Sequence, residues 1–344
     1  MNKKVYLDIK SQYDALRKEA YERQQQRINE VFKVIPEIRD IEERIRLCGL
    51  KYNMLILTGK QESNEVVKEL DCEIERLRNK KESLLKEHGF PPDYLEIRYK
   101  CPKCLDTGYI EATNERCSCF RQELLNRLYN ESNLVATHVE NFDNFDERLF
   151  SREVNEIKYG IKISPRENIG RIRKRCEAFI ENFDSPTEKN LFFSGPAGVG
   201  KTFMANCISK ELIERGYTVL YQTAPMLFNT ITDYKLRAYK DDEFDDDAYK
   251  SIFEVELLII DDLGTEPSSE ARYAELLNIL NTRQLNNLKR PCKTIISTNF
   301  GPKQLYEYYT ERVASRIIGS FDRLMFAGDD IRAIKNRIQN ARYE

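Results

Sequence analysis

The stretch LFFSGPAGVGKTFMANCISKEL, residues 191–212, determines the fold of the C-terminal part of the chain. Its centre, Gly195–Thr202, reads GPAGVGKT and fits the phosphate-binding loop pattern G-x-x-x-x-G-K-[ST] without a mismatch. An apolar strand is expected before the loop, over 191–194, and a helix after it, over 203–215. In this context, backbone N–H groups of the loop and of the helix N-terminus point at bound phosphates. The sequence therefore predicts a nucleotide site.

All eight residues of the loop are expected to contact the nucleotide: Gly195, Pro196, Ala197, Gly198, Val199, Gly200, Lys201 and Thr202. The Lys201 ammonium is expected to neutralise the β and γ phosphates, and the Thr202 hydroxyl is expected to bind Mg²⁺. The loop reads phosphates and not the base, so this motif alone does not distinguish ATP from GTP.

Polar residues end two further strands. The segment VELLIIDDLG, 255–264, places Asp261 and Asp262 after four apolar residues. Asp261 is expected to hold Mg²⁺ through water, and Asp262 to orient or activate the attacking water. The strand KTIISTNF, 293–300, ends near Asn299. In a parallel sheet Asn299 lies next to the two aspartates, where it can bind the γ-phosphate or the water.

Apolar strands and amphipathic helices alternate through the C-terminal half. A further strand is expected over 218–223, and helices over 165–183 and 269–288. This alternation predicts an α/β domain with a parallel sheet covered on both faces.

Four cysteines form two close pairs in the segment 99–120, YKCPKCLDTGYIEATNERCSCF. Cys101 and Cys104 form C-x-x-C, and Cys117 and Cys119 form C-x-C. Four thiolates with this spacing can surround one Zn²⁺ tetrahedrally. Unrelated buried thiols and a redox pair are the alternatives, and the redox pair is disfavoured because no strand precedes it. Since no open coordination position or catalytic partner is apparent, we predict a structural zinc.

The region from about residue 12 to residue 88 is charged and helical in pattern. Apolar residues in alternating steps of three and four occur at Val67, Leu70, Ile74, Leu77 and Leu84, with Lys81 in one seam position. The same rhythm occurs at Ile38, Ile41 and Ile45, after Pro36. With a turn at LTGK, 57–60, the pattern predicts a helical hairpin like a short coiled coil. This helical hairpin is expected to be either a solvated stalk or a surface on which a partner docks.

Length and charge limit the classes of protein that fit. The chain has 344 residues, which suggests two or three domains, and its formal net charge is -2. A nearly neutral protein is not a general polyanion binder, so any contact with nucleic acid must be local. No run approaches the roughly 18 apolar residues of a membrane helix, and the cysteine spacing favours metal over disulfides. We expect a cytoplasmic protein without a membrane partner.

The phosphate loop is followed in order by LLIIDDLG, IISTN, ERVASRIIGSF and GDDIRAIKNR. This set resembles AAA+ ATPases of the DnaC/DnaI type, which load bacterial replicative helicases, and the related IstB-type transposition helpers. The resemblance covers about residues 141–340 and implies an AAA+ P-loop domain with a small lid, with ATP as the nucleotide. It implies that Arg316 is the arginine finger that reaches a neighbouring subunit's nucleotide, with Arg312 a weaker candidate. Arg332 matches the second sensor, which contacts the nucleotide of its own subunit. Both roles use a planar cation against phosphate charge.

The resemblance also implies a function. DnaI-type loaders carry a zinc-binding N-terminal domain that docks onto the helicase, whereas transposition helpers are shorter and lack it. The sequence therefore favours an ATP-dependent loader that assembles when ATP is bound and places the replicative helicase on single-stranded DNA. An IstB-like transposition helper and an adaptor switched by ATP are the alternatives. The expected domains are a helical region over 1–95, a zinc module over 96–140 and the ATPase over 141–344.

Two segments of the ATPase region modify this prediction. Most AAA+ ATPases have Glu where Asp262 stands, and the shorter carboxylate would suit slow turnover. The segment 224–254 corresponds to a helical insertion that contacts single-stranded DNA in the family. Its cations and rings are Lys235, Arg237, Lys240, Tyr234 and Tyr239. The run 241–247 weighs against DNA contact, because six of its seven residues are acidic.

Overall fold

The computed structural model describes residues 3–58, 63–127, 140–238 and 247–340. The chain divides into two compact units, one formed by Lys10–Glu115 and the other by Met1–Ile9 together with Arg116–Glu344. No helix in the described ranges is both long enough and apolar enough to cross a lipid bilayer.

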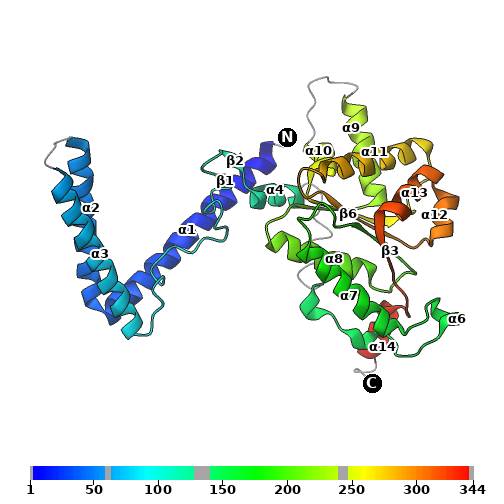
Figure 1. Ribbon diagram of the computed structural model, residues 1–344, viewed down its shortest axis with the longest axis horizontal. Helices are drawn as coiled ribbons and strands as arrows, with labels where there is room; N and C mark the ends of the chain where they lie inside the picture. The colour runs from blue at the N-terminus through cyan, green and yellow to red at the C-terminus, as the bar shows by residue number, and fades with distance from the viewer. Residues whose placement is uncertain (1–2, 59–62, 128–139, 239–246, 341–344) are drawn as a thin grey trace. The chain divides into compact units, whose positions relative to one another are not determined.

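The first unit is built on α1 (Lys3–Val34) from Lys10 onward, α2 (Pro36–Thr58) and α3 (Ser63–Glu87). Pro36 opens α2, since its fixed φ and missing N–H suit a first helical turn. α2 and α3 run side by side (Figure 1), so the predicted helical region is confirmed. Part of the predicted turn over 57–60 lies outside the described residues.

Burial in this unit is concentrated where α1 passes into α2. A small core joins Val31, Ile35, Ile38, Leu85 and Leu95. Across the hairpin, Lys81 from the predicted seam donates to Glu42 Oε1 at 2.9 Å. A lysine in this position keeps its ammonium paired at the edge of the seam.

A two-stranded sheet of β1 (Tyr109–Ile110) and β2 (Glu115–Arg116) follows, and then α4 (Ser118–Leu125). Before this sheet, the buried Asp106 carboxylate accepts the backbone N–H groups of Lys100 at 2.8 Å and Cys101 at 2.7 Å. Asp106 thereby fixes the turn that carries the first cysteine pair.

The second unit is centred on a parallel five-stranded sheet in the order β4-β5-β6-β3-β7. The strands are β3 (Asn190–Ser194), β4 (Val219–Thr223), β5 (Leu257–Leu263), β6 (Lys293–Thr298) and β7 (Phe321–Met325). The predicted parallel sheet is confirmed, but β7 was not predicted. This edge strand alternates in exposure and lacks the continuous apolar run of the other strands.

Helices cover both faces of the sheet (Figure 1). One face packs against α7 (Pro165–Glu181) and α8 (Lys201–Glu214). The other packs against α9 (Ala224–Ala238), α10 (Asp247–Glu254), α11 (Glu270–Asn286), α12 (Pro302–Tyr308) and α13 (Glu311–Ser320). Short elements η2 (Phe142–Asn144), η3 (Glu147–Leu149) and α6 (Glu156–Tyr159) precede α7, and α14 (Ile331–Asn340) ends the described chain.

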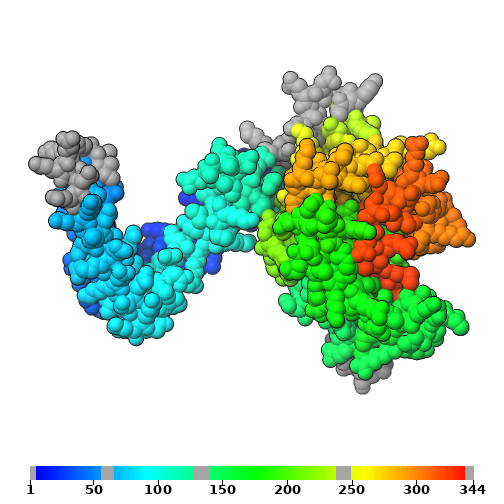
Figure 2. Space-filling model, in the orientation of Figure 1, coloured from blue at the N-terminus to red at the C-terminus, as the bar shows by residue number. Residues whose placement is uncertain are grey.

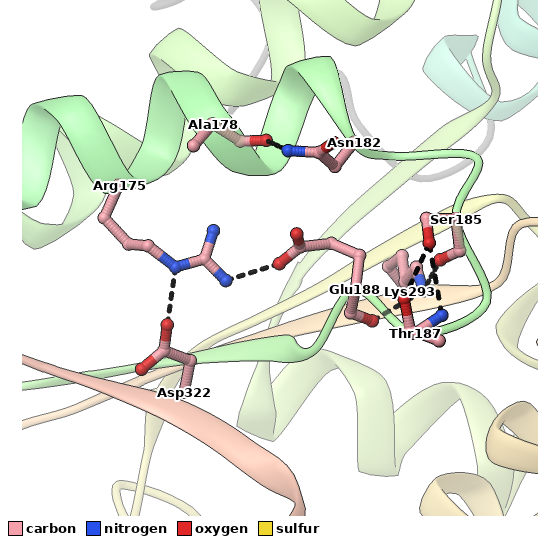
Figure 3. A network of polar contacts seen from close by, with 8 residues as sticks. All are labelled: Arg175, Ala178, Asn182, Ser185, Thr187, Glu188, Lys293 and Asp322. Carbon is pink, nitrogen blue, oxygen red and sulfur yellow. Dashed lines mark hydrogen bonds and ion pairs between the residues drawn. The ribbon is translucent and has the colours of Figure 1, made fainter.

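An ion network fastens α7 to the edge of the sheet (Figure 3). Arg175 of α7 donates from Nε to Asp322 of β7 at 2.5 Å and from its other side to Glu188, just before β3. Lys293, at the start of β6, donates to the backbone oxygens of Ser185 at 2.8 Å and Glu188 at 2.7 Å. In Figure 2 the green surface, which includes α7, lies beside the orange-red surface of the C-terminal part of the chain. The network fixes β7, after which the chain turns back toward the phosphate loop.

Candidate nucleotide site

The phosphate loop connects β3 to α8 as the motif requires. The helix begins at Lys201, two residues earlier than predicted, so Lys201 and Thr202 lie in its first turn. Gly200 forms the N-cap with φ 94°, a left-handed conformation that glycine adopts without strain. A Cβ at Gly198 would lie 2.2 Å from Asp330 Oδ1, so only glycine permits this close approach.

The Lys201 ammonium uses all three of its donors inside the site. Nζ donates to the backbone oxygens of Gly195 and Pro196, both at 2.7 Å, and to Asn299 Oδ1 at 2.8 Å. Burial lowers the pKa of this ammonium, and the charges of Asp261 and Asp262 oppose that shift. A buried cation held by neutral acceptors is well prepared for anionic phosphate oxygens.

Asp261 accepts three hydrogen bonds at the end of β5. Oδ2 accepts the Thr202 hydroxyl at 3.0 Å and the Tyr221 hydroxyl, and Oδ1 accepts the backbone N–H of Asp262 at 3.0 Å. The pairing of β5 with β6 shifts in register between Ile260 and Leu263, so neither aspartate is in the regular β5–β6 ladder, although Asp261 still pairs with Thr223 of β4. Asp261 and Thr202, the two residues predicted to hold magnesium, are hydrogen-bonded to each other.

Asp262 adopts a left-handed backbone conformation with φ 53°, which is uncommon for a residue other than glycine. Burial, followed by the negative charge of Asp261, raises the pKa of its carboxyl group, while Lys201 and Arg332 act in the opposite sense. A strained backbone and a raised carboxyl pKa are typical of a functional position.

The C-terminal segment reaches the loop through Asp330. Its Oδ1 accepts the backbone N–H of Arg332 at 2.8 Å and thereby caps α14, while the Ile331 N–H donates to Gly198 O at 2.9 Å. These contacts hold the first turn of α14 against the phosphate loop. Arg332 consequently lines the same cavity as Lys201.

The cavity has a volume of about 380 Å³ and is lined by both polar and apolar side chains. The polar part of its lining is Lys201, Thr202, Asp262, Asn299 and Arg332. The apolar part is Phe145, Leu149, Phe150, Ile169, Phe203 and Ile331. Charged and aromatic groups in one lining suit a nucleotide, which has a phosphate chain and a flat base.

Sequence reasoning missed the apolar part of the lining and Tyr221. Phe145, Leu149 and Phe150 come from the connecting segment before α7, whose repeated Asn-Phe-Asp was the available signal. Tyr221 lies inside an ordinary strand, where nothing in the local pattern distinguishes it from a core residue. Burial and the neighbouring Asp261 raise the pKa of its hydroxyl, which therefore stays protonated and donates.

Arg316 is outside this cavity. It lies on α13, half-buried, and donates from Nε to Asn281 Oδ1 of α11 at 2.9 Å. Asn281 thus orients the guanidinium within the described chain. Its predicted action on a neighbouring subunit stays a prediction.

The segment predicted to touch DNA is partly used for packing. Tyr234 stacks on Tyr249 with ring centroids 3.9 Å apart, and Lys235 pairs with Glu275. Tyr239, Lys240 and the acidic residues 241–246 lie outside the described residues.

The four predicted zinc ligands meet in one cluster. The sulfur atoms of Cys101, Cys104, Cys117 and Cys119 all lie within 4.8 Å of one another. Cys104 and Cys117 are buried and the other two are partly exposed. Four converging thiols fit one tetrahedral Zn²⁺ without a further ligand.

The fold and the site define a P-loop domain with a parallel sheet covered by helices on both faces. Residues 168–329 match the family model described as IstB-like ATP binding protein. The predicted resemblance to loaders and insertion-sequence ATPases is confirmed by this match and by the relatives below.

Among curated proteins, DnaC of Escherichia coli (strain K12), a replicative helicase loader, is 27% identical over 160 residues, covering 46% of this chain and 62% of DnaC. A Sinorhizobium fredii protein, named as an insertion sequence ATP-binding protein, is 28% identical over 153 residues, covering 43% of this chain and 58% of that protein. The loader DnaI of Bacillus subtilis is 25% identical over 133 residues, covering 38% of this chain and 40% of DnaI. The chain therefore spans less than two thirds of each of these relatives.

Two solved structures are similar to part of this chain. The DnaC helicase loader is 26% identical with a TM-score of 0.39, covering 53% of this chain and 99% of that chain. AMPPCP-bound DnaA from Aquifex aeolicus is 21% identical with a TM-score of 0.43, covering 59% of this chain and 55% of that chain.

Proposed function

We propose that this protein binds and hydrolyses ATP, and that the cycle places a bacterial replicative helicase on single-stranded DNA during replication initiation or restart. The observation that carries the nucleotide part is that Lys201, Thr202 and Asn299 line one cavity, with Asp261 accepting the hydroxyl of Thr202 beside it. The loader part is supported by the relatives named as helicase loaders and by the helical and cysteine-rich N-terminal region. The proposed place of action is the cytoplasm.

In the proposed ATP complex, the loop and Lys201 bind the phosphates, and Arg332 contacts them from α14. Thr202 and Asp261 hold Mg²⁺, which would neutralise developing charge on the phosphates. Asp262 orients or deprotonates the attacking water, and Asn299 binds that water or the γ-phosphate. Arg316 completes the site of a neighbouring copy, so hydrolysis depends on assembly.

The variant Asp262→Glu tests whether the aspartate at this position makes ATP hydrolysis slow and switch-like. Its carboxylate is one methylene shorter than the usual Glu and so reaches the water less well. Asp262→Glu should therefore raise the steady-state rate of ATP hydrolysis. An unchanged or lower rate, with unchanged nucleotide affinity, would count against this explanation.

The helicase is the proposed partner of the helical and zinc-binding regions, 1–95 and 96–140. The full chain, loaded with zinc and ATP, is expected to co-elute with the host's hexameric replicative helicase in size-exclusion chromatography. Cys101→Ser should abolish co-elution, because it removes one of four converging thiols. Failure of the unmodified chain to bind would refute the loader function but not the ATPase function.

A transposition helper is the second candidate, favoured by the match to the IstB-like family model. It predicts binding to a transposase in place of the helicase. An ATP-switched adaptor is the third, and it predicts nucleotide binding with negligible turnover that DNA does not change. Pull-down with each partner and turnover with and without single-stranded DNA separate the three candidates.

A further inference from the structure

Tyr221 is a buried residue whose hydroxyl contacts Asp261, the acceptor of the Thr202 hydroxyl in the phosphate loop. It lies in the middle of β4, is 3% exposed, and packs its ring in the apolar cluster shared with α7 and α8. Its hydroxyl donates to Asp261 Oδ2 across the β4–β5 pair. The loop and strand motifs that mark the nucleotide site do not include this residue.

The hydrogen bonds of Asp261 show what the hydroxyl does. A carboxylate has about four acceptor positions, two on each oxygen. Oδ2 accepts the hydroxyls of Tyr221 and Thr202, which fill its two positions. Oδ1 accepts the N–H of Asp262, which leaves one of its positions open. The carboxylate is 3% exposed and is fixed from three directions.

We propose that Tyr221 is a positioning residue of the nucleotide site, which fixes Asp261 so that Oδ1 is the oxygen available to a magnesium-bound water. The inference rests on the proposed function, since it concerns magnesium held with ATP. The Tyr221 hydroxyl donates to Asp261 and also interacts with the Thr202 hydroxyl, so Tyr221 acts through these two residues and not by touching the nucleotide.

Packing does not account for the hydroxyl. Phenylalanine has the same ring and would fill the same apolar cluster, whereas burying a hydroxyl is costly without an acceptor. The acceptor here is the carboxylate that the phosphate loop also uses through Thr202. Losing the tyrosine hydroxyl would leave Oδ2 with one donor and allow the carboxylate to rotate toward Thr202.

The test is the effect of Tyr221→Phe on nucleotide affinity with and without magnesium. A fluorescent ATP analogue is titrated into the full chain in Mg²⁺ and in EDTA, and folding is checked by circular dichroism. We expect about 10-fold weaker binding in Mg²⁺, the size of one charge-assisted hydrogen bond, and a change below about twofold in EDTA.

Tyr217→Phe is the matched control. The Tyr217 hydroxyl also donates to a carboxylate, Asp184 Oδ2 at 2.8 Å, but this carboxylate is not the one that accepts the Thr202 hydroxyl of the phosphate loop. This variant should bind the analogue like the unmodified chain in both buffers.

Three results of these titrations would contradict the proposal or the function on which it rests. Equal magnesium dependence in Tyr221→Phe and the unmodified chain would overturn the proposal, even if the variant melted at a lower temperature, because the hydroxyl would then be only structural. A wild-type chain that binds the analogue equally in Mg²⁺ and EDTA would also overturn it. A wild-type chain that binds no nucleotide would refute the proposed function itself.

Discussion

The five-stranded parallel sheet and the α2–α3 hairpin bury their apolar side chains to different extents. In β5, Leu257 to Ile260 are fully buried between two layers of helices. In the hairpin, Ile38 and Leu77 are buried, but Leu50 and Met54, further along α2, are 50% and 66% exposed. A sheet buried on both faces can place polar groups at its strand ends within hydrogen-bond distance of one another. A two-helix hairpin instead leaves apolar surface exposed, which suits a proposed docking region.

Zinc removal should separate the two regions most clearly. Cys104→Ser removes a buried thiol from the four-cysteine cluster, so we expect the content of about one zinc per chain to fall close to zero. Nucleotide affinity should stay unchanged, because the cluster does not line the nucleotide cavity. Metal analysis and nucleotide titration on the same sample check both statements. Stoichiometric zinc in the variant would contradict the assignment of ligands.

Lys201→Ala should disable the nucleotide site and leave the hairpin intact. Losing the ammonium that faces the phosphates should weaken ATP binding at least about 100-fold, or about 2.7 kcal/mol. Isothermal titration calorimetry measures the affinity. Lys210→Ala, in the same helix but paired with Glu214 on the surface, is the control and should bind normally. Affinity within about threefold of the unmodified chain in Lys201→Ala would show that the loop is not a phosphate site.

Leu77→Ala should lower the stability of the α2–α3 hairpin and leave nucleotide binding unchanged. Leu77 is 1% exposed, and its truncation is expected to cost about 2–3 kcal/mol of unfolding free energy. Urea unfolding followed by helical circular dichroism measures the loss, and ATP affinity should not change. Val66→Ala, at a position 43% exposed on the same helix, should cost less than about 0.5 kcal/mol. Equal costs for the two variants would mean that the seam is not packed as described.

Asp262→Asn should change stability less than Leu77→Ala does, and the change should be a gain. Because the folded state raises the pKa of Asp262, it binds a proton more tightly than the unfolded chain does. Ionisation at neutral pH therefore costs folding free energy, and Asn removes that cost. Asn also tolerates the left-handed φ of 53°. We expect a gain of up to about 1 kcal/mol at pH 7 with loss of turnover.

The difference in stability between Asp262→Asn and the unmodified chain should depend on pH. The advantage of Asn over Asp should be absent below the ordinary Asp pKa and should grow as the pH rises through the higher pKa of the folded state. Thermal unfolding of both proteins from pH 4 to pH 8 measures it. A stability gap that narrows as the pH rises would contradict the stated environment of Asp262.

The sequence predicted those parts of the molecule that depend on local pattern. The phosphate loop, the apolar strands and the paired cysteines each have a fixed spacing, and the structure pairs Lys201 with Asn299 and Thr202 with Asp261. Their catalytic roles stay predictions. The small differences in helix and strand ends do not change this arrangement.

The features that could not be predicted from the sequence depend on contacts between segments that are distant in the chain. Tyr221 reaches Asp261 only because β4 pairs with β5 in a particular register, and Phe145 lines the cavity because the connecting segment returns to α8. Tyr234, expected to be available for stacking on bases, is stacked on Tyr249 of α10 instead. No spacing rule within one segment contains these contacts.

The central claim is tested most directly by the rate of ATP hydrolysis by the full chain alone, with the host's replicative helicase, and with the helicase plus single-stranded DNA. We predict slow turnover alone and a several-fold increase when helicase and DNA are both present, with Asp262→Asn inactive throughout. Turnover that never exceeds that of Asp262→Asn would contradict the claim that this site is an ATPase. Turnover that ignores the helicase would contradict its role as a loader.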